Sequence, residues 1–226
     1  MLFSWKKNRT KKRIFLNKNN DDLLEELKEK GIVNENVLGA VKKVPRELFV
    51  NEISIQSAYE NMPLPIDCGQ TISQPYVVAY MIECLKLKKL DIVLEIGTGT
   101  GYQTAIISYL CKKIYTIEIF NKLFNQAKIN INKLKIKNVI YKLGNGVNGW
   151  EEKILFDAII VSAAAKKIPL KLLQNLKNYG SLIIPKKYSL ENQKLILIKK
   201  TSKNSFNQKE LFDVKFVPLL NNNIEY

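Results

Sequence analysis

The sequence predicts an α/β fold: a doubly wound, mostly parallel sheet with helices on both faces, preceded by a helical extension and followed by a strand pair. From residue 91 onward, short and nearly continuous apolar segments alternate with helical ones, as in a parallel sheet that is covered on both faces. A glycine-rich turn, "GTGTG" (97–101), joins the first of these strands to a helix. With 226 residues, of which 46% are hydrophobic, the chain is long enough to bury one full-sized core.

The first part of the chain predicts two helices and an irregular segment. Residues 1–20 carry several basic side chains and no acid, and we expect a flexible tail there. "DDLLEELKEK" (21–30) has its acids early and its lysines late, and "VLGAVKKV" (37–44) ends at Pro45, so each predicts a helix. Residues 46–68 show no periodicity and are expected to be irregular.

The stretch "GQTISQPYVVAY" (69–80) places amides, hydroxyls and a proline directly before an apolar segment. Pro75 suits the first turn of a helix over 75–85, and Ser73 is available as its N-cap. No strand or ordinary helix requires such an opening, so the loop is a candidate for holding a ligand.

The remaining elements follow from the alternation of apolar strands and helices. We expect strands at 91–96, 113–119, 138–143, 156–164 and 181–185, helices at 102–112, 120–134 and 169–177, and a final pair of strands at 194–200 and 211–219.

Composition excludes several kinds of chemistry. The chain has no histidine, which removes Ser-His-Asp and Cys-His nucleophile systems and histidine metal sites. Cys68, Cys84 and Cys111 show no CxxC spacing, so we expect reduced thiols, no metal site and a cytoplasmic location. No apolar run approaches the length of a membrane helix, so no membrane partner is expected.

The charge of the chain is strongly positive, with 36 Lys+Arg against 21 Asp+Glu and a net charge of +15. Lysine is abundant along the whole sequence, and only residues 1–20 form a basic block. A nucleic-acid partner for that block is one interpretation, and a solvated, flexible tail is the one we favour.

The glycine turn and two acids indicate a nucleotide-like cofactor. Gly97, Gly99 and Gly101 permit a tight turn and a close approach of ligand to backbone. Glu118 ends the second strand, where a carboxylate can accept both hydroxyls of a ribose. Dinucleotides and S-adenosylmethionine both fit, but Glu95 beside the turn would repel a pyrophosphate and can receive an ammonium. We therefore favour S-adenosylmethionine over a dinucleotide, and over a turn that only packs a helix.

A second turn, "KLGNGVNGW" (142–150), follows the third strand. In a Rossmann-like sheet this turn lies beside the adenine, so Asn145 is placed to accept from the exocyclic amine. A plain Asn-Gly turn without a ligand is an equally good interpretation of these residues alone.

With these pieces aligned, the chain resembles the protein-L-isoaspartate O-methyltransferases over roughly residues 21–220. The matching stretches include VPRELFV (44–50), PLPIDCGQTISQPYVVAYM (63–81), VLEIGTGTGYQTAI (93–106), GNGVNGW (144–150) and FDAIIVSAAAKKIP (156–169). GSLIIP (180–185) and FVPL (216–219) continue the match in the same order. The LEIGTG turn is common to many methyltransferases, whereas GQTISQP is far more specific to this family.

The resemblance implies methyl transfer from S-adenosylmethionine to the α-carboxyl of L-isoaspartyl residues in damaged proteins and peptides, which starts their repair through a succinimide. It implies that Ser73 and Thr71 lie at the substrate carboxylate. The residues that it implies at the cofactor are Gln70, Ile72, Glu95, Gly97, Thr98, Gly99, Gly101, Glu118, Asn145 and Gly146. It further implies one methyltransferase domain over 21–226, with N-terminal helices and a substrate loop (21–90), a cofactor-binding core (91–185) and C-terminal strands (186–226).

Two residues depart from the family pattern: Asn145 stands where an acid is usual, and Asp67 where a glycine is usual. We expect weaker rather than absent cofactor binding from the first and an altered substrate loop from the second. The alternative functions are a methyltransferase that acts on RNA and a non-catalytic basic cofactor-binding module. We expect isoaspartyl proteins and peptides as substrates, and a monomer.

Overall fold

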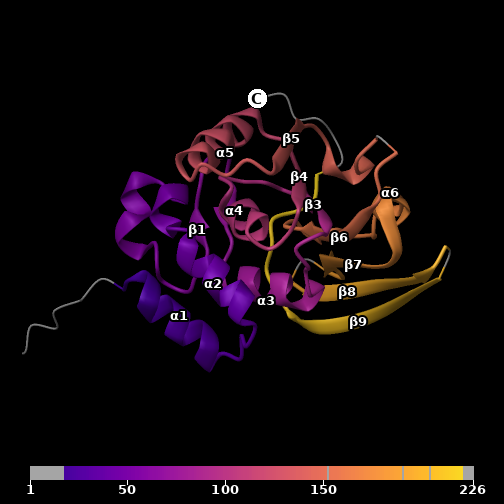
Figure 1. Cartoon of the computed structure of the whole chain (residues 1–226), viewed down its shortest axis with the longest axis horizontal. Helices are drawn as coiled ribbons and strands as arrows, with labels where there is room; N and C mark the ends of the chain where they lie inside the picture. The colour runs from indigo at the N-terminus through magenta and orange to yellow at the C-terminus, as the bar shows by residue number, and fades with distance from the viewer. Residues whose placement is uncertain (1–17, 152, 190, 204, 221–226) are drawn as a thin grey trace, which may run out of the picture.

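The chain is described by a computed structural model that covers residues 18–220 apart from 152, 190 and 204. Its main sheet has the strand order β5-β4-β3-β6-β7-β8-β9 (Figure 1). Strands β3 to β7 run parallel, and β8 and β9 add antiparallel to one edge. The strands are β3 (Ile92–Ile96), β4 (Lys113–Glu118), β5 (Val139–Leu143), β6 (Phe156–Val161), β7 (Leu176–Lys187), β8 (Gln193–Ser202) and β9 (Ser205–Asp213).

Helices cover both faces of this sheet, as the sequence predicts. The α-helices are α1 (Asn20–Glu29), α2 (Glu35–Lys43), α3 (Pro75–Leu85), α4 (Tyr102–Ser108), α5 (Asn121–Lys133) and α6 (Leu170–Asn175). Val93 and Ile160 face the core that is shared with α1 to α5, whereas Leu94 and Ile159 face the one shared with α6. In Figure 1, α1, α2 and α4 lie to the left of β3, β6 and β7, and α6 lies to their right. Successive strand residues thus pack on opposite faces, which is the pattern of a strand buried on both sides.

Most predicted elements are confirmed with shifted ends, and one of these shifts has a clear cause. The helix predicted over 102–112 ends at Ser108, because the backbone N–H groups of Lys112 and Lys113 already donate to Asp91 at the start of β3 and β4. Strand β7 begins at Leu176 instead of 181, and α6 correspondingly ends at Asn175.

The prediction of a last strand over 211–219 is wrong. Strand β9 pairs with β8 over Ser205–Asp213, and the chain then leaves the sheet. Residues 216–219 lie beside the end of β6, where Ala164 donates its N–H to the Val217 carbonyl at 2.8 Å and Leu219 donates to Ala164 at 2.9 Å. These residues are half-buried or exposed and lie against a loop rather than in the sheet, and their alternation alone could not distinguish the two.

The prediction of an irregular segment over 46–68 is also wrong. It forms two 3-10 helices, η1 (Arg46–Phe49) and η2 (Glu52–Ser57), and the strand β1 (Leu64–Pro65), which pairs with β2 (Thr71–Ile72). The fully buried Arg46 organises this region. Its guanidinium donates to four backbone carbonyls, those of Ala58, Glu60, Met62 and Ser73. One side chain therefore satisfies the backbone of a segment that has too little periodicity to be predicted.

The hairpin β1–β2 carries the loop that the sequence singles out. Its turn places Cys68 and Gly69 at φ values of 58° and 63°, and Gln70 donates its N–H to the Asp67 carbonyl at 3.1 Å. Two consecutive residues with positive φ make a type I′ turn, which matches the twist of a hairpin. The Asp67 carboxylate pairs with Lys122 at the start of α5, at 2.9 Å.

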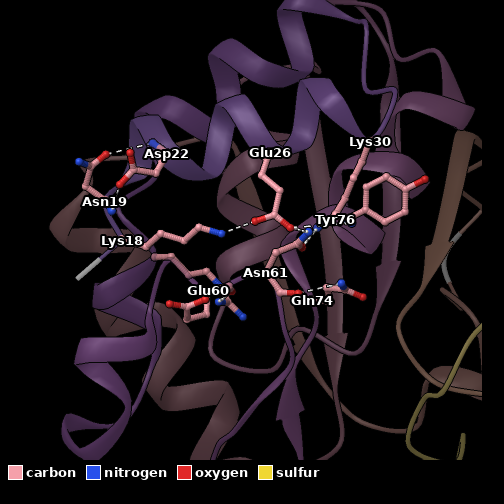
Figure 2. A network of polar contacts seen from close by, with 10 residues as sticks. Lys18, Asn19, Asp22, Glu26, Lys30, Glu60, Asn61, Gln74 and Tyr76 are labelled. Carbon is pink, nitrogen blue, oxygen red and sulfur yellow. Dashed lines mark hydrogen bonds and ion pairs between the residues drawn. The ribbon is translucent and has the colours of Figure 1, made fainter. Parts of the chain in front are cut away.

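The N-terminus of α3 is capped from outside the loop, so the prediction that Ser73 caps it is wrong. The N-cap is Gln74, which makes no capping bond with its own side chain. Instead Asn61 accepts the Tyr76 N–H at 2.9 Å through its side-chain oxygen, and its amide donates to Glu26 at 2.8 Å (Figure 2). The Ser73 hydroxyl makes no hydrogen bond to another described residue and remains available for a ligand.

The predicted tail begins to fold before its expected end. Asn19 caps α1 by accepting the N–H groups of Asp21 and Asp22, and Lys18 forms an ion pair with Glu26 (Figure 2). Residues 1–17 and the asparagine-rich end at 221–226 lie outside the described residues.

Candidate active site

A cavity opens at the carboxyl ends of β3, β4, β5 and β6. Strand β3 lies between β4 and β6, so the direction of strand addition reverses there, and this is where open α/β sheets bind ligands. The cavity encloses about 860 Å³, its open mouth included, which lies within the usual range for small-molecule sites. Of the residues predicted at the site, those that line it are Gln70, Thr71, Ile72, Ser73, Gly97, Thr98, Gly99, Glu118, Asn145 and Gly146.

The glycine turn after β3 forms the floor of the cavity. Gly97 and Gly99 adopt φ values of 89° and 57°, which side chains other than glycine rarely adopt. Gly101 also has a positive φ, 99°, but it does not line the cavity. A Cβ atom there would approach the Ile131 Cδ1 atom to 3.0 Å, so this glycine allows α4 to pack against α5.

Glu118 is held at the cavity by backbone donors. Its Oε2 atom accepts the Gly99 N–H at 2.7 Å, and its Oε1 atom accepts the N–H groups of Ile119 and Phe120 at 2.9 and 3.0 Å. Burial raises the pKa of this carboxyl, and the three backbone donors oppose that rise. The carboxylate is thus rigidly placed at the carboxyl end of β4, where the sequence predicts a ribose partner.

Glu95 occupies a different position from the one that the sequence suggests. Its side chain is fully buried beneath the glycine turn and does not line the cavity. It accepts hydrogen bonds from Gln103 at 3.0 Å, from Thr104 and, at 2.6 Å, from Thr116. Burial raises the pKa of Glu95 to about 7, against the opposing effect of these donors. Sequence position alone could not show that the carboxylate points into the protein.

The turn after β5 brings Asn145 and Gly146 to the cavity wall. The Asn145 side-chain oxygen accepts the Val147 N–H at 3.0 Å, so part of its acceptor capacity serves its own turn. Gly146 packs directly on β3, because a Cβ atom there would lie 2.2 Å from the Ile96 Cγ2 atom. No other residue fits this position without displacing the Ile96 side chain.

A second hollow, here called the groove, adjoins the cavity. It is lined by Pro63, Thr71, Ser73, Gln74, Tyr76, Val77, Ser162 and 212–217. Thr71, Ser73, Ser162 and Val217 line both hollows and so lie at their junction. The two predicted substrate residues are therefore among the four that separate a cofactor-sized cavity from an open groove.

Several lining residues were not predicted. Ser162 and Ala163 follow β6, Gln103 lies on α4, and Val217 to Leu220 cover the cavity from the C-terminal side. The only signal for them was that all of them except Leu220 lie in stretches that match the family. Their meeting at one cavity depends on tertiary packing.

The residues that line the cavity indicate which of the two candidate cofactors fits. Among those that the structure describes, the cavity is lined by one carboxylate, Glu118, and by no lysine or arginine. An anionic wall and a floor of glycines suit a cation with a ribose, as in S-adenosylmethionine. A pyrophosphate would lie close to Glu118 without a cationic partner, which argues against a dinucleotide.

The fold and the cavity define a Rossmann-like methyltransferase whose cofactor is S-adenosylmethionine. The sequence model of the family described as protein-L-isoaspartate(D-aspartate) O-methyltransferase (PCMT) matches residues 17–224. The chain belongs to this family, and it is an enzyme.

Relatives and solved structures agree with this assignment. A protein-L-isoaspartate O-methyltransferase of Parvibaculum lavamentivorans is 45% identical over 201 residues, which cover 88% of this chain and 90% of that protein. One of Dictyoglomus thermophilum is 47% identical over 197 residues, covering 87% and 89%. The crystal structure of a PCMT-type protein of Plasmodium falciparum in complex with S-adenosyl-L-homocysteine matches with a TM-score of 0.80 and 31% identity, over 91% of this chain and all of that one.

In the part of the chain that the structure covers, no three or more His, Cys, Asp or Glu side chains gather as a metal-binding group. Likewise, no helix among residues 18–220 is both long and apolar enough to cross a membrane.

Proposed function

We propose that the protein methylates the α-carboxyl of L-isoaspartyl residues in damaged proteins and peptides, with Ser73 and Thr71 orienting that carboxylate. The observation that carries these roles is the position of both hydroxyls at the junction of cavity and groove. The Ser73 hydroxyl is free of capping because Asn61 caps α3 instead. The cofactor is held by Glu118, the glycine turn at Gly97 and Gly99, and the turn at Asn145 and Gly146.

The reaction requires alignment rather than proton transfer. A carboxylate with an ordinary pKa near 4 is already ionised at neutral pH, so the absence of histidine from the chain is no obstacle. When bound, S-adenosylmethionine supplies a methyl group on a positively charged sulfur that leaves as a neutral thioether. Neutral hydroxyls orient the carboxylate without forming the ion pair by which a lysine would weaken its nucleophilicity. Residues 217–220 and the substrate loop limit the access of water, which supports the proximity effect.

The proposal is tested with an isoaspartyl peptide and its normal aspartyl twin. Labelled methyl groups should pass from S-adenosylmethionine to the first peptide and not to the second. Equal labelling of both peptides, or of neither, would contradict the proposed function.

The role of Ser73 is tested by its replacement. Ser73→Ala should lower kcat/KM for the isoaspartyl peptide by about 10- to 100-fold, the worth of one hydrogen bond to a charged group. The affinity for S-adenosyl-L-homocysteine, measured by calorimetry, should stay within about twofold of the parent. A large loss of that affinity would instead assign Ser73 to the cofactor.

We also propose a reducing, cytoplasmic location and a monomeric protein. Cys68, Cys84 and Cys111 are unpaired, which supports a compartment in which thiols stay reduced. The cavity takes residues from 21–90, 91–185 and 186–226, which supports the proposal that these parts act as one domain. For residues 1–20 we favour the absence of a nucleic-acid partner, and salt-sensitive RNA binding by the full chain would argue against this.

A further inference from the structure

The position of Ser162 in the structure could not be predicted from its neighbours in the sequence or from the fact that it is a serine. Ser162 is the first residue after β6, and its N–H donates to the Ile96 carbonyl at 2.9 Å, which fixes its backbone beside the glycine turn. Among the described residues, it is the only side-chain hydroxyl outside the substrate loop that lines both the cavity and the groove. It therefore faces the junction from the sheet, whereas Thr71 and Ser73 face it from the loop.

The direction of the Ser162 hydroxyl follows from its hydrogen-bond partner. The Gln103 side-chain nitrogen lies 2.8 Å from Ser162 Oγ and 3.0 Å from Glu95 Oε1. An amide nitrogen only donates, and it carries two hydrogens, one for each of these acceptors. The reverse orientation of the amide would place its oxygen against the Glu95 carboxylate. Ser162 Oγ is thus an acceptor toward Gln103, and its own hydrogen is left to donate elsewhere.

These hydrogen bonds give the buried Glu95 carboxylate a role at the site. Thr104 and Thr116 hold Glu95 from the other side, so the row Glu95, Gln103, Ser162 is anchored at its buried end. No other hydrogen bond of the Ser162 hydroxyl is found among the described residues. Its hydrogen has the junction in front of it, where a carboxylate oxygen would accept.

We propose that Ser162 is a second carboxylate-binding hydroxyl, which acts opposite Ser73 and is oriented by Gln103 and Glu95. The inference rests on the proposed function, because it gives the isoaspartyl carboxylate a donor on each side. A carboxylate has two oxygens, and two donors from different elements restrict its rotation better than one. Gln103 and Glu95 are positioning residues in this arrangement, since neither needs to touch the substrate.

The experiment compares three replacements in the full chain, and the parent must first methylate the isoaspartyl peptide. Ser162→Ala should lower kcat/KM about 10- to 100-fold and weaken binding of the peptide to the complex with S-adenosyl-L-homocysteine about tenfold. Ser162→Thr keeps the hydroxyl and should stay within about threefold of the parent. The matched control is Ser108→Ala, since the Ser108 hydroxyl donates to Ala105 within α4 and lies away from the cavity.

Replacement of Gln103 tests the direction of its hydrogen bond with Ser162 as well as the presence of that bond. Gln103→Glu brings a second carboxyl against Glu95, so one proton is held between the two carboxyls and the other oxygen of the new side chain is an acceptor toward Ser162. The Ser162 hydroxyl then donates to that oxygen and is lost to the substrate, so peptide affinity should fall as in Ser162→Ala, and thermal unfolding checks that the variant is folded. Gln103→Met removes the donor without adding an acceptor and should have a smaller effect.

Three outcomes would overturn the inference. Ser162→Ala could match Ser108→Ala in peptide affinity, it could weaken S-adenosyl-L-homocysteine instead of the peptide, or Gln103→Glu could bind peptide like the parent. If the parent itself leaves the isoaspartyl peptide unmethylated, the proposed function fails and not this inference alone.

Discussion

At the scale of single residues, Gly146 shows how closely the cofactor turn is packed on the sheet. A Cβ atom at this position would lie 2.2 Å from Ile96 Cγ2, at the end of β3. The turn or the Ile96 side chain must therefore move if any side chain is added, and both contribute to the cavity. The need for glycine is steric here.

This packing predicts opposite effects for two Gly→Ala replacements. Gly146→Ala should lower the free energy of unfolding by about 1–3 kcal/mol and weaken S-adenosyl-L-homocysteine, because the crowded atoms must shift. Gly39→Ala, in the middle of α2 with nothing within 4 Å of the new Cβ, should raise it by up to about 1 kcal/mol. Urea unfolding and calorimetry measure both quantities. A Gly146→Ala protein with unchanged stability would show that the turn relaxes without cost.

At the scale of elements, α1 supports the active site although it does not touch the cavity. Asn61 lies between Glu26 of α1 and the first turn of α3, and it also accepts from Gln74 through its backbone carbonyl (Figure 2). The helical extension thus fixes the point at which the substrate loop enters α3. This leaves Ser73 free to face the junction.

Asn61 and Ser73 should therefore differ in what their loss affects. Asn61→Ala removes a cap and a side-chain bond and should lower the free energy of unfolding by about 1–2 kcal/mol. Ser73→Ala removes no described hydrogen bond, so it should leave stability nearly unchanged while turnover falls. Thermal unfolding of both proteins beside the peptide assay separates the two roles. Equal stability of the two variants would argue against Asn61 as the cap.

An ion pair joins the hairpin β1–β2 to α5 across the mouth of the cavity. Asp67 and Lys122 form this ion pair, and Ile66, Phe120 and Leu123 beside them line the cavity. An altered substrate loop is expected from Asp67, and this ion pair is the contact that the Asp67 carboxylate makes there.

Removal of the Asp67–Lys122 ion pair should speed the release of the ligand from the cavity. Asp67→Gly or Lys122→Ala should raise the dissociation rate of S-adenosyl-L-homocysteine by roughly two- to fivefold, a small effect because the pair is exposed. High salt should produce the same change in the parent and little in the variants, since it screens the pair. Stopped-flow fluorescence or absorbance measures the rate of ligand release. Identical rates for the parent and the variants at all salt concentrations would show that the ion pair does not affect ligand release.

Sequence patterns predicted those parts of the molecule that local interactions determine. Strand β3, its glycine turn and Glu118 were found because strand, turn and helix are contiguous in the chain. The cap of α3 was missed because it comes from Asn61, 15 residues before the Tyr76 N–H that it accepts. Ser162 was missed for the same reason, since its partner Gln103 and the Glu95 carboxylate that Gln103 also contacts lie on other elements. What the sequence could not predict was which polar groups satisfy one another across the fold.

At the scale of the whole molecule, carboxyls in different surroundings have opposite effects on stability. Burial raises the pKa of Glu95 to about 7 and also raises that of Glu118. The hydrogen bond from Lys18 lowers the pKa of Glu26. A carboxyl with a raised pKa binds its proton more tightly in the folded state, so its effect on stability has the opposite sign to that of Glu26.

These signs predict a fall in stability as the pH rises toward neutrality. Between pH 4.5, the ordinary value of a glutamate, and about 7, the unfolded state has lost the Glu95 proton while the folded state retains part of it. The free energy of unfolding must then decrease with rising pH, by about 3 kcal/mol for this group across the window. Glu95→Gln cannot titrate, so the stability of the parent relative to this variant should decline by that amount. Urea unfolding of both proteins from pH 4.5 to 8 measures the difference. Glu26→Gln is the control, because the contribution of Glu26 is lost only as the pH falls below its ordinary value, and its difference from the parent should stay level in this window. If the curves of the parent and Glu95→Gln run parallel, the Glu95 carboxyl does not titrate there.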